Sequence, residues 1–160
     1  MNGKGFLLDT NAIIQLLKGN KELLSIISGA DFISTSIISE LEYFSFSGLS
    51  EEDVLLYKTF RSRIHVYGVP SDDPTFTCLV VSARKKYGMK LPDSLIAATA
   101  RANDLIVLTA DEHFKRLTLP WKVQLFPVMA LYTRSAAEVP RVLLYCVHPG
   151  LRCFRRKDEA

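Results

Sequence analysis

The fold is decided by a short apolar run that ends in an acid, Gly5-Phe6-Leu7-Leu8-Asp9-Thr10-Asn11. A run of this kind is typical of a buried strand. Thr10 and Asn11 then supply side chains that cap helices, and apolar residues continue at helical spacing as far as Gly19. The stretch therefore predicts a strand that is followed at once by a helix.

The same alternation continues along the chain. Further strands are predicted at residues 31–38, 64–69, 105–109 and 123–126, and further helices at 21–28, 39–46, 50–62, 73–87, 92–102 and 111–117. Strands that alternate with helices form a parallel sheet with both faces covered. We therefore expect an α/β fold with a short parallel sheet of about five strands, flanked by helices on both faces.

Length and composition describe one ordinary globular domain. The chain has 160 residues, of which 48% are hydrophobic and 23% are charged, and this excludes a disordered protein. Cys78, Cys146 and Cys153 form no Cys-x-x-Cys pair, which argues against a disulfide framework or a cysteine zinc site and fits the cytoplasm. Asp9 interrupts the N-terminal apolar stretch, and no apolar run approaches the roughly 18 residues of a membrane span. We expect no signal peptide and no membrane association.

The net charge of +3 is unevenly distributed. Residues 1–133 hold 14 basic and 14 acidic residues, whereas residues 134–160 hold six basic and three acidic ones. A globally basic nucleic-acid binder is excluded, so polyanions must be bound by local patches. We expect one domain over residues 1–133 and a basic C-terminal tail over 134–160, in which 142–147 could form one more strand or a docking segment.

Four acids lie where predicted strands end or helices begin: Asp9, Glu42, Asp93 and Asp111. The carboxyl ends of parallel strands form the crevice in which α/β proteins bind ligands. Clustered carboxylates repel one another, and Mg²⁺ or Mn²⁺ relieves that repulsion because hard cations prefer oxygen ligands. Such a site can activate a water and neutralise charge on a phosphoryl group.

Each acid also suits a structural role. Asp93 and Asp111 have the positions of helix caps, and Glu42 could complete a capping box with Ser39. Glu40 competes with Glu42, because residues two apart on a helix point about 200° apart and cannot share one inward face. The phase of the predicted capping box favours Glu42, and Glu40 remains the alternative.

The joint order of these motifs resembles the PIN-domain family and, within it, the VapC-type toxin ribonucleases. The pieces that carry the resemblance are residues 7–11, 36–42, 91–100 and 108–114, within a span of roughly 6–126. The resemblance implies a Rossmann-like PIN domain and endonucleolytic cleavage of RNA with one or two Mg²⁺ or Mn²⁺ ions. It also implies neutralisation by a cognate antitoxin that inserts into the active-site groove, and we expect a homodimer.

The resemblance also assigns roles to single residues. Asp9, Asp93 and Asp111 match the family's metal-binding aspartates, and the family's glutamate follows a Ser or Thr by three positions, which selects Glu42. Side chains near these acids could orient their carboxylates, although most of them suit cap positions equally well. These weaker candidates are Thr10, Asn11, Ser94, Thr109 and, in the alternative register, Glu40.

A basic patch precedes Asp93 and consists of Arg84, Lys85, Lys86 and Lys90. It could hold an RNA backbone, or it could simply be a solvated helix end where cations suit the helix dipole. Three aromatic residues follow Glu42 on one short predicted helix, and we expect them to make core or dimer contacts and not to stack on bases. They are Tyr43, Phe44 and Phe46.

The acids, taken with the resemblance, favour a metal-dependent endoribonuclease of toxin type over three other classes. A phosphatase of the haloacid dehalogenase type needs a second aspartate two positions after the first, where this chain has Asn11. A dinucleotide-binding domain is excluded because no Gly-x-Gly-x-x-Gly follows the first strand. A catalytically silent PIN-like module for RNA binding or assembly could have lost its acids, yet all four positions keep one.

Overall fold

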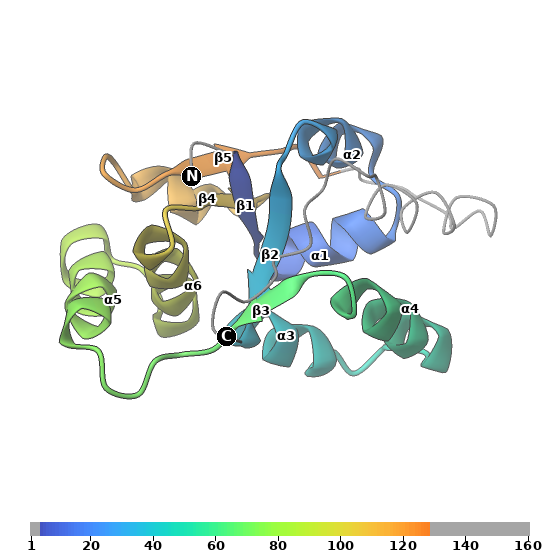
Figure 1. Ribbon diagram of the computed structural model, residues 1–160, viewed down its shortest axis with the longest axis horizontal. Helices are drawn as coiled ribbons and strands as arrows, with labels where there is room; N and C mark the ends of the chain where they lie inside the picture. Colours follow the sequence, from blue (N-terminus) through green and yellow to red (C-terminus); the bar gives the residue numbers. More distant parts are fainter. Residues whose placement is uncertain (1–3, 129–160) are drawn as a thin grey trace, which may run out of the picture.

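The computed structural model describes residues 4–128, and within them a five-stranded sheet with the strand order β3-β2-β1-β4-β5 (Figure 1). All neighbouring strands are parallel, which confirms the predicted α/β fold. The strands are β1 (Gly5–Leu8), β2 (Phe32–Ser36), β3 (His65–Tyr67), β4 (Ile106–Thr109) and β5 (Val123–Leu125). The helices are α1 (Thr10–Leu17), α2 (Lys21–Ser28), α3 (Ile37–Phe44), α4 (Glu51–Arg61), α5 (Pro74–Tyr87), α6 (Leu91–Ala102) and the 3₁₀-helix η1 (Glu112–Arg116).

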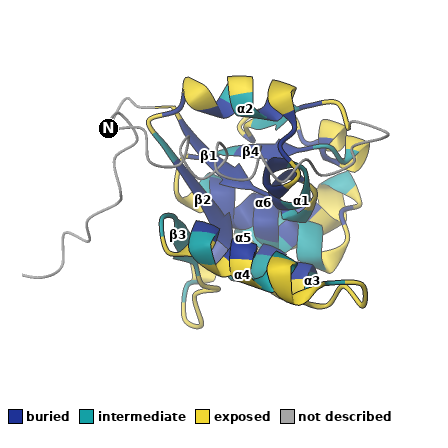
Figure 2. Ribbon diagram, turned by 90° about the vertical axis from the view of Figure 1, so that its right-hand side faces the viewer, coloured by how far each residue is buried: buried dark blue, intermediate teal, exposed yellow. Residues whose placement is uncertain are grey.

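The central strand β1 is buried on both of its faces, because successive side chains point to opposite sides of the sheet. Phe6 and Leu8 pack into a core that also takes side chains from α1, α2 and α4. Leu7 packs on the other side, into a core with side chains from α5 and α6. Figure 2 shows the strands as a buried layer inside helices whose outer surfaces are exposed. An apolar strand without polar alternation is what a parallel sheet covered on both faces requires.

The start of α3 differs from the prediction. Ile37 and Ile38, expected in a strand, belong to α3, because the Ser36 hydroxyl accepts a hydrogen bond from the Ser39 N–H at 3.1 Å and caps the helix there. Ser39 is buried within α3, so the predicted capping box of Ser39 with Glu42 is wrong. The β-branched character of Ile37 and Ile38 is a weak preference that the cap overrides.

Two more helix starts were mispredicted. The N-cap of α1 is Asp9, whose Oδ1 accepts a hydrogen bond from the Ala12 N–H at 2.7 Å, whereas Thr10 and Asn11 lie inside the helix. The N-cap of α6 is Lys90, which makes no side-chain cap hydrogen bond, so Asp93 lies in the first turn and is not the cap.

The helix predicted at 111–117 is the 3₁₀-helix η1, with Asp111 as its N-cap. The strand predicted at 64–69 is limited to β3, since only its central residues pair with β2.

The last described residues belong to the packed fold. Phe126 is buried, and the Asn20 side-chain amide donates a hydrogen bond to the Pro127 carbonyl at 3.2 Å. The predicted tail 134–160, with its possible strand at 142–147, lies outside the described residues, and the boundary at 133 stays a prediction. Among the helices of residues 4–128, none is long and apolar enough to cross a bilayer.

Candidate active site

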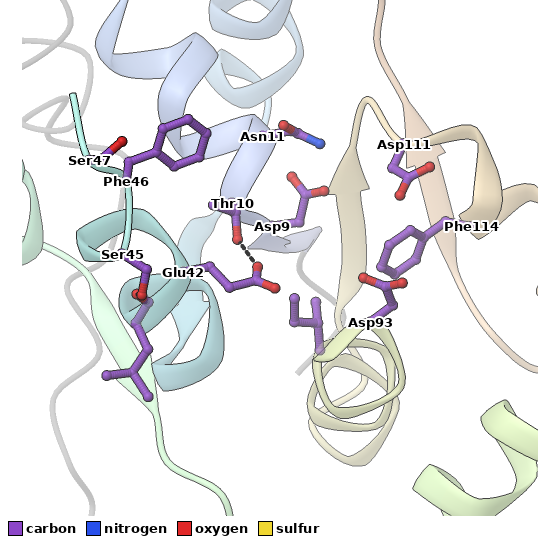
Figure 3. Close-up of a pocket in the computed structure, with 12 residues that line it drawn as sticks. Asp9, Thr10, Asn11, Glu42, Ser45, Phe46, Ser47, Asp93, Asp111 and Phe114 are labelled. Carbon is purple, nitrogen blue, oxygen red and sulfur yellow. Dashed lines mark hydrogen bonds between the residues drawn. The ribbon is translucent and has the colours of Figure 1, made fainter. Parts of the chain in front are cut away.

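The sheet register brings the ends of three strands together. Leu8 of β1 pairs with Leu108 of β4 on one side and with Thr35 of β2 on the other. The residue that follows each strand therefore lies at the same carboxyl edge of the sheet. All four acids predicted from the sequence line one cavity of about 640 Å³ at this edge. They are Asp9, Glu42, Asp93 and Asp111 (Figure 3).

Asp9 is the most deeply buried of the four, with 4% of its surface exposed. Its Oδ1 accepts the Ala12 N–H at 2.7 Å, and its Oδ2 accepts the hydroxyl of Thr109. Burial raises the pKa of Asp9 to about 7, although both hydrogen bonds act to lower it; the negative charges of Asp111 and Glu42 add to the increase. A nearby cation would therefore favour the ionised form of this carboxylate at neutral pH.

Glu42 and Glu40 occupy different surroundings, although only two residues separate them. Glu42 lines the cavity and accepts a hydrogen bond from the Thr10 hydroxyl. Glu40 does not line it. Its Oε2 accepts hydrogen bonds from the Tyr57 hydroxyl at 3.0 Å and from Arg61 Nε at 2.7 Å. Glu40 therefore ties α3 to α4, and the geometry favours Glu42 as the acid of the site.

Asp93 lies in the first turn of α6, and its pKa is raised by burial and by the negative charges of Asp111 and Glu42. Asp111 differs. Burial acts to raise its pKa, but the hydrogen bonds and charge of His113 outweigh this and hold the pKa below its ordinary value. Its Oδ1 lies 2.8 Å from both the backbone nitrogen and Nδ1 of His113. Because a carboxylate only accepts, both nitrogens donate.

The weaker candidates divide into those that reach the acids and those that do not. The Thr10 hydroxyl donates a hydrogen bond to Glu42, and the Thr109 hydroxyl donates one to Asp9. Carboxylates that bind a metal need such hydrogen bonds to fix their orientation. Asn11 is exposed and lines the cavity. Ser94 is buried and does not line it, because its hydroxyl donates to the Lys90 carbonyl at 2.7 Å.

The basic patch has one member near the acids. The positive charge of Lys90, just before α6, opposes the increase in the pKa of Asp93 and contributes to the decrease in the pKa of Asp111. The other members are exposed in the last turn of α5, and none of them lines the cavity. These are Arg84, Lys85 and Lys86.

Two residues of the site were missed by the sequence analysis. His113 contacts Asp111, and this contact could have been anticipated, because an aspartate N-cap accepts hydrogen bonds two residues on. Phe46 was assigned to core or dimer contacts, yet it lines the cavity. It lies two residues beyond the end of α3, so no helical spacing in the sequence indicates its position.

The donor set fits a hard divalent cation, because it consists of carboxylate oxygens and a bound cation would favour the ionised form of the deepest of them, Asp9. Within residues 4–128, no three His, Cys, Asp or Glu side chains converge into a ready-made metal cage. Mg²⁺ does not need one, since it keeps several waters and is held by one or two carboxylates. Asp9 with Asp111 or Glu42 would suffice.

Comparison with known proteins agrees with this arrangement. A family model described as PIN domain matches residues 6–119. A chain of a toxin–antitoxin complex from Klebsiella pneumoniae is 22% identical with a TM-score of 0.63. The match covers 76% of the present chain and 98% of the matched chain. A chain of VapBC2 from Rickettsia felis, bound to a DNA fragment from its promoter, is 21% identical with a TM-score of 0.62. The match covers 76% of the present chain and 98% of the matched chain. A chain of FitAcB from Neisseria gonorrhoeae is 22% identical with a TM-score of 0.55. The match covers 74% of the present chain and 95% of the matched chain.

At these identities the likeness to solved structures establishes a common fold. No curated protein matches the chain.

Proposed function

This chain belongs to the PIN domain family, and we propose on that premise that it is a metal-dependent endoribonuclease acting as the toxin of a toxin–antitoxin pair. The observation that carries the proposal is the cavity at the carboxyl edge of the sheet, around which four carboxylates from distant parts of the chain are gathered. A structural role for the acids would not explain why Asp9 is buried among other negative charges.

The four acids and two neighbouring threonines each have a defined part in the proposed reaction. Asp9, Asp93, Asp111 and Glu42 would hold one or two Mg²⁺ or Mn²⁺ ions. A bound ion of this kind supplies an activated water and a counter-charge for the phosphodiester. The Thr109 and Thr10 hydroxyls fix the carboxylates of Asp9 and Glu42, which limits their reorganisation when the substrate enters.

The proposed toxin role implies an antitoxin partner. Several neighbours in fold are described as complexes of a toxin with its antitoxin or as VapBC assemblies. We propose that a cognate antitoxin covers the cavity of this chain as well, that the toxin is a cytoplasmic homodimer and that RNA is the substrate. A small reading frame directly upstream, with a DNA-binding head, would support the pairing. Its product should co-purify with this chain.

A nuclease assay separates the three candidate classes. The full chain is incubated with a long RNA and Mn²⁺, with or without EDTA, and in parallel with p-nitrophenyl phosphate. Cleavage of RNA that EDTA abolishes supports the proposal. Release of p-nitrophenol without RNA cleavage favours a phosphatase, and RNA binding without either reaction favours a silent PIN module.

Asp9→Asn is the matched variant for the same assay. It removes one ligand charge while keeping the volume of the side chain and its ability to accept the Ala12 N–H. RNA cleavage should fall below detection while the circular dichroism spectrum stays unchanged. Full activity in a pure preparation of this variant would contradict the assignment.

A further inference from the structure

The carboxylate of Asp111 is held through one of its two oxygens. Oδ1 accepts the backbone N–H of His113 at 2.8 Å and, also at 2.8 Å, the ring N–H at Nδ1 of the same residue. No other group of residues 4–128 donates to this carboxylate, and none contacts Oδ2. Since Asp111 lines the cavity, Oδ2 is the oxygen that stays available to a bound cation.

The His113 ring is not fixed by packing. Its side chain is 59% exposed, against 30% for that of Asp111, and it belongs to neither core. Among the described residues, the ring makes no hydrogen bond except the one to Asp111, and it meets no other ring. The Asp111 carboxylate therefore accounts for where the ring lies, and the question is what the ring does for Asp111.

The ring supplies a restraint that the helix cap alone does not. As the N-cap of η1, Asp111 needs to accept only a backbone N–H, and rotation of an aspartate carboxylate about its last side-chain bond is soft. A second donor that converges on the same oxygen opposes this rotation and so fixes the direction of Oδ2. A ligand that is held in place beforehand loses less freedom when an ion binds.

We propose that His113 is a positioning residue, whose Nδ1–H holds Oδ1 of Asp111 so that Oδ2 is presented to the divalent cation. This inference rests on the metal dependence of the proposed function and deepens it. The competing explanation is a direct contact of the other ring nitrogen, Nε2, with RNA or with the ion. Positioning is favoured because the Nδ1 contact is already made in the metal-free chain.

The test measures Mn²⁺ binding by the full chain without RNA, from the electron paramagnetic resonance signal of the free ion. His113→Leu removes both ring nitrogens. His113→Asn keeps an N–H on the atom bonded to Cγ, which is the position of Nδ1, whereas His113→Gln carries its N–H farther out, near the position of Nε2. The control is Lys115→Gln, because Lys115 is exposed on the same 3₁₀-helix and pairs with Glu112 at 2.6 Å.

His113→Leu should weaken Mn²⁺ binding about 10-fold, at the lower end of the effect of losing such a partner, because the contact is exposed to water. His113→Gln should bind as weakly as His113→Leu. His113→Asn and Lys115→Gln should both stay within about threefold of the wild type. Thermal unfolding in EDTA should differ by less than about 4 °C among all these proteins, since the substitutions lie at the surface.

A double-mutant cycle shows whether the effect passes through Asp111. In the Asp111→Asn background the ligand charge is gone, so His113→Leu should weaken Mn²⁺ binding no further. A loss of the same size in both backgrounds would mean that the ring acts on the ion without Asp111, and it would overturn the inference.

The other outcomes separate this inference from the proposed function. Mn²⁺ binding that depends on His113, without RNA cleavage by the wild type, would overturn the proposed ribonuclease and support the positioning role. Wild-type affinity for His113→Leu, or recovery by His113→Gln but not by His113→Asn, would overturn the positioning role alone. So would unchanged Mn²⁺ binding with lost RNA cleavage, because the ring would then contact the substrate. No Mn²⁺ binding by the wild type would overturn both.

Discussion

The hydroxyl of Thr109 donates a hydrogen bond to Oδ2 of Asp9, although the two residues lie one hundred positions apart in the chain. The same hydroxyl oxygen accepts the Asp111 N–H at 2.9 Å. One buried side chain at the end of β4 thus connects the acid that follows β1 with the acid that follows β4. The pairing of Leu8 with Leu108 places it there.

Thr109→Val should weaken metal binding while keeping the shape of the side chain. Valine leaves Asp9 Oδ2 without its donor and Asp111 N–H without its acceptor, so both acids lose their fixed positions. Loss of such a partner typically costs about 10- to 100-fold in metal affinity or activity. The measurement is the Mn²⁺ concentration that gives half-maximal RNA cleavage. Thr109→Ser, which restores the hydroxyl, should return it close to the wild-type value, and identical Mn²⁺ titrations for valine and threonine would disprove the role.

The stability of the metal-free protein should depend on pH through Asp9. Its pKa is raised from 3.8 to about 7 in the folded state, so the folded chain binds more protons than the unfolded chain between these values. Stability contributed by this group is therefore lost as the pH rises through that window. Asp9→Asn removes the effect. In EDTA, the free energy of unfolding of the variant minus that of the wild type should increase from pH 4 to 7 and then level off.

Urea unfolding curves at several pH values provide that measurement. Added Mn²⁺ should stabilise the wild type at pH 7 more than the variant, because only an ion that binds the folded state shifts the equilibrium. Curves for the two proteins that run parallel across the whole pH range would show that Asp9 titrates normally.

Glu42→Gln and Glu40→Gln should have opposite effects. Glu42→Gln should abolish RNA cleavage with little change in stability, because it alters an acid of the cavity. Glu40→Gln should retain activity but lose about 1–2 kcal/mol of stability, since its hydrogen bonds with Tyr57 and Arg61 no longer involve a carboxylate. RNA cleavage rates and thermal unfolding of both variants decide the matter. An inactive Glu40→Gln with an active Glu42→Gln would reverse the assignment.

A chain truncated after Thr133 should fold and keep its metal-dependent activity. Phe126 is buried and the Pro127 carbonyl accepts a hydrogen bond from Asn20, so the truncation point lies beyond the last residues described in the packed fold. Thermal unfolding and RNA cleavage of the truncated and full chains provide the comparison. Increased activity would show that the basic tail blocks the cavity, and an insoluble product would refute the domain boundary.

The sequence predicted the order of the elements well, because apolar periodicity is set by burial. It failed at the start of α3, where Ser36 and Ser39 both suit a cap and only the path of β2 selects Ser36. Glu42, the glutamate that the sequence favours for the site, nevertheless lines the cavity. The two serines lie three residues apart, close to one helical turn, so choosing the wrong one hardly rotates the helix.

Contacts between distant residues were beyond the sequence. Thr109 and Ser94 are equal candidates from the sequence alone. The Thr109 hydroxyl donates a hydrogen bond to Asp9 across the sheet, whereas the Ser94 hydroxyl donates to the Lys90 carbonyl at the start of its own helix. The difference depends on strand register and side-chain direction, and neither leaves a local pattern. The exposure of Phe46 likewise depends on the path of the chain after α3, since Tyr43, which is equally aromatic and precedes it by three residues, is buried.

Asp9 both caps α1 and lines the cavity. This double role limits which substitutions an inactive copy of the gene could accumulate at position 9. A duplicated copy that lost its activity would be under no pressure to keep an acid at position 9, yet it would still need an acceptor for the Ala12 N–H. Alanine there would cost about 0.5–2 kcal/mol, whereas asparagine or serine would cost little. Inactive copies should therefore carry a short polar residue at position 9. They should vary freely at position 42, because Glu42 does not cap a helix.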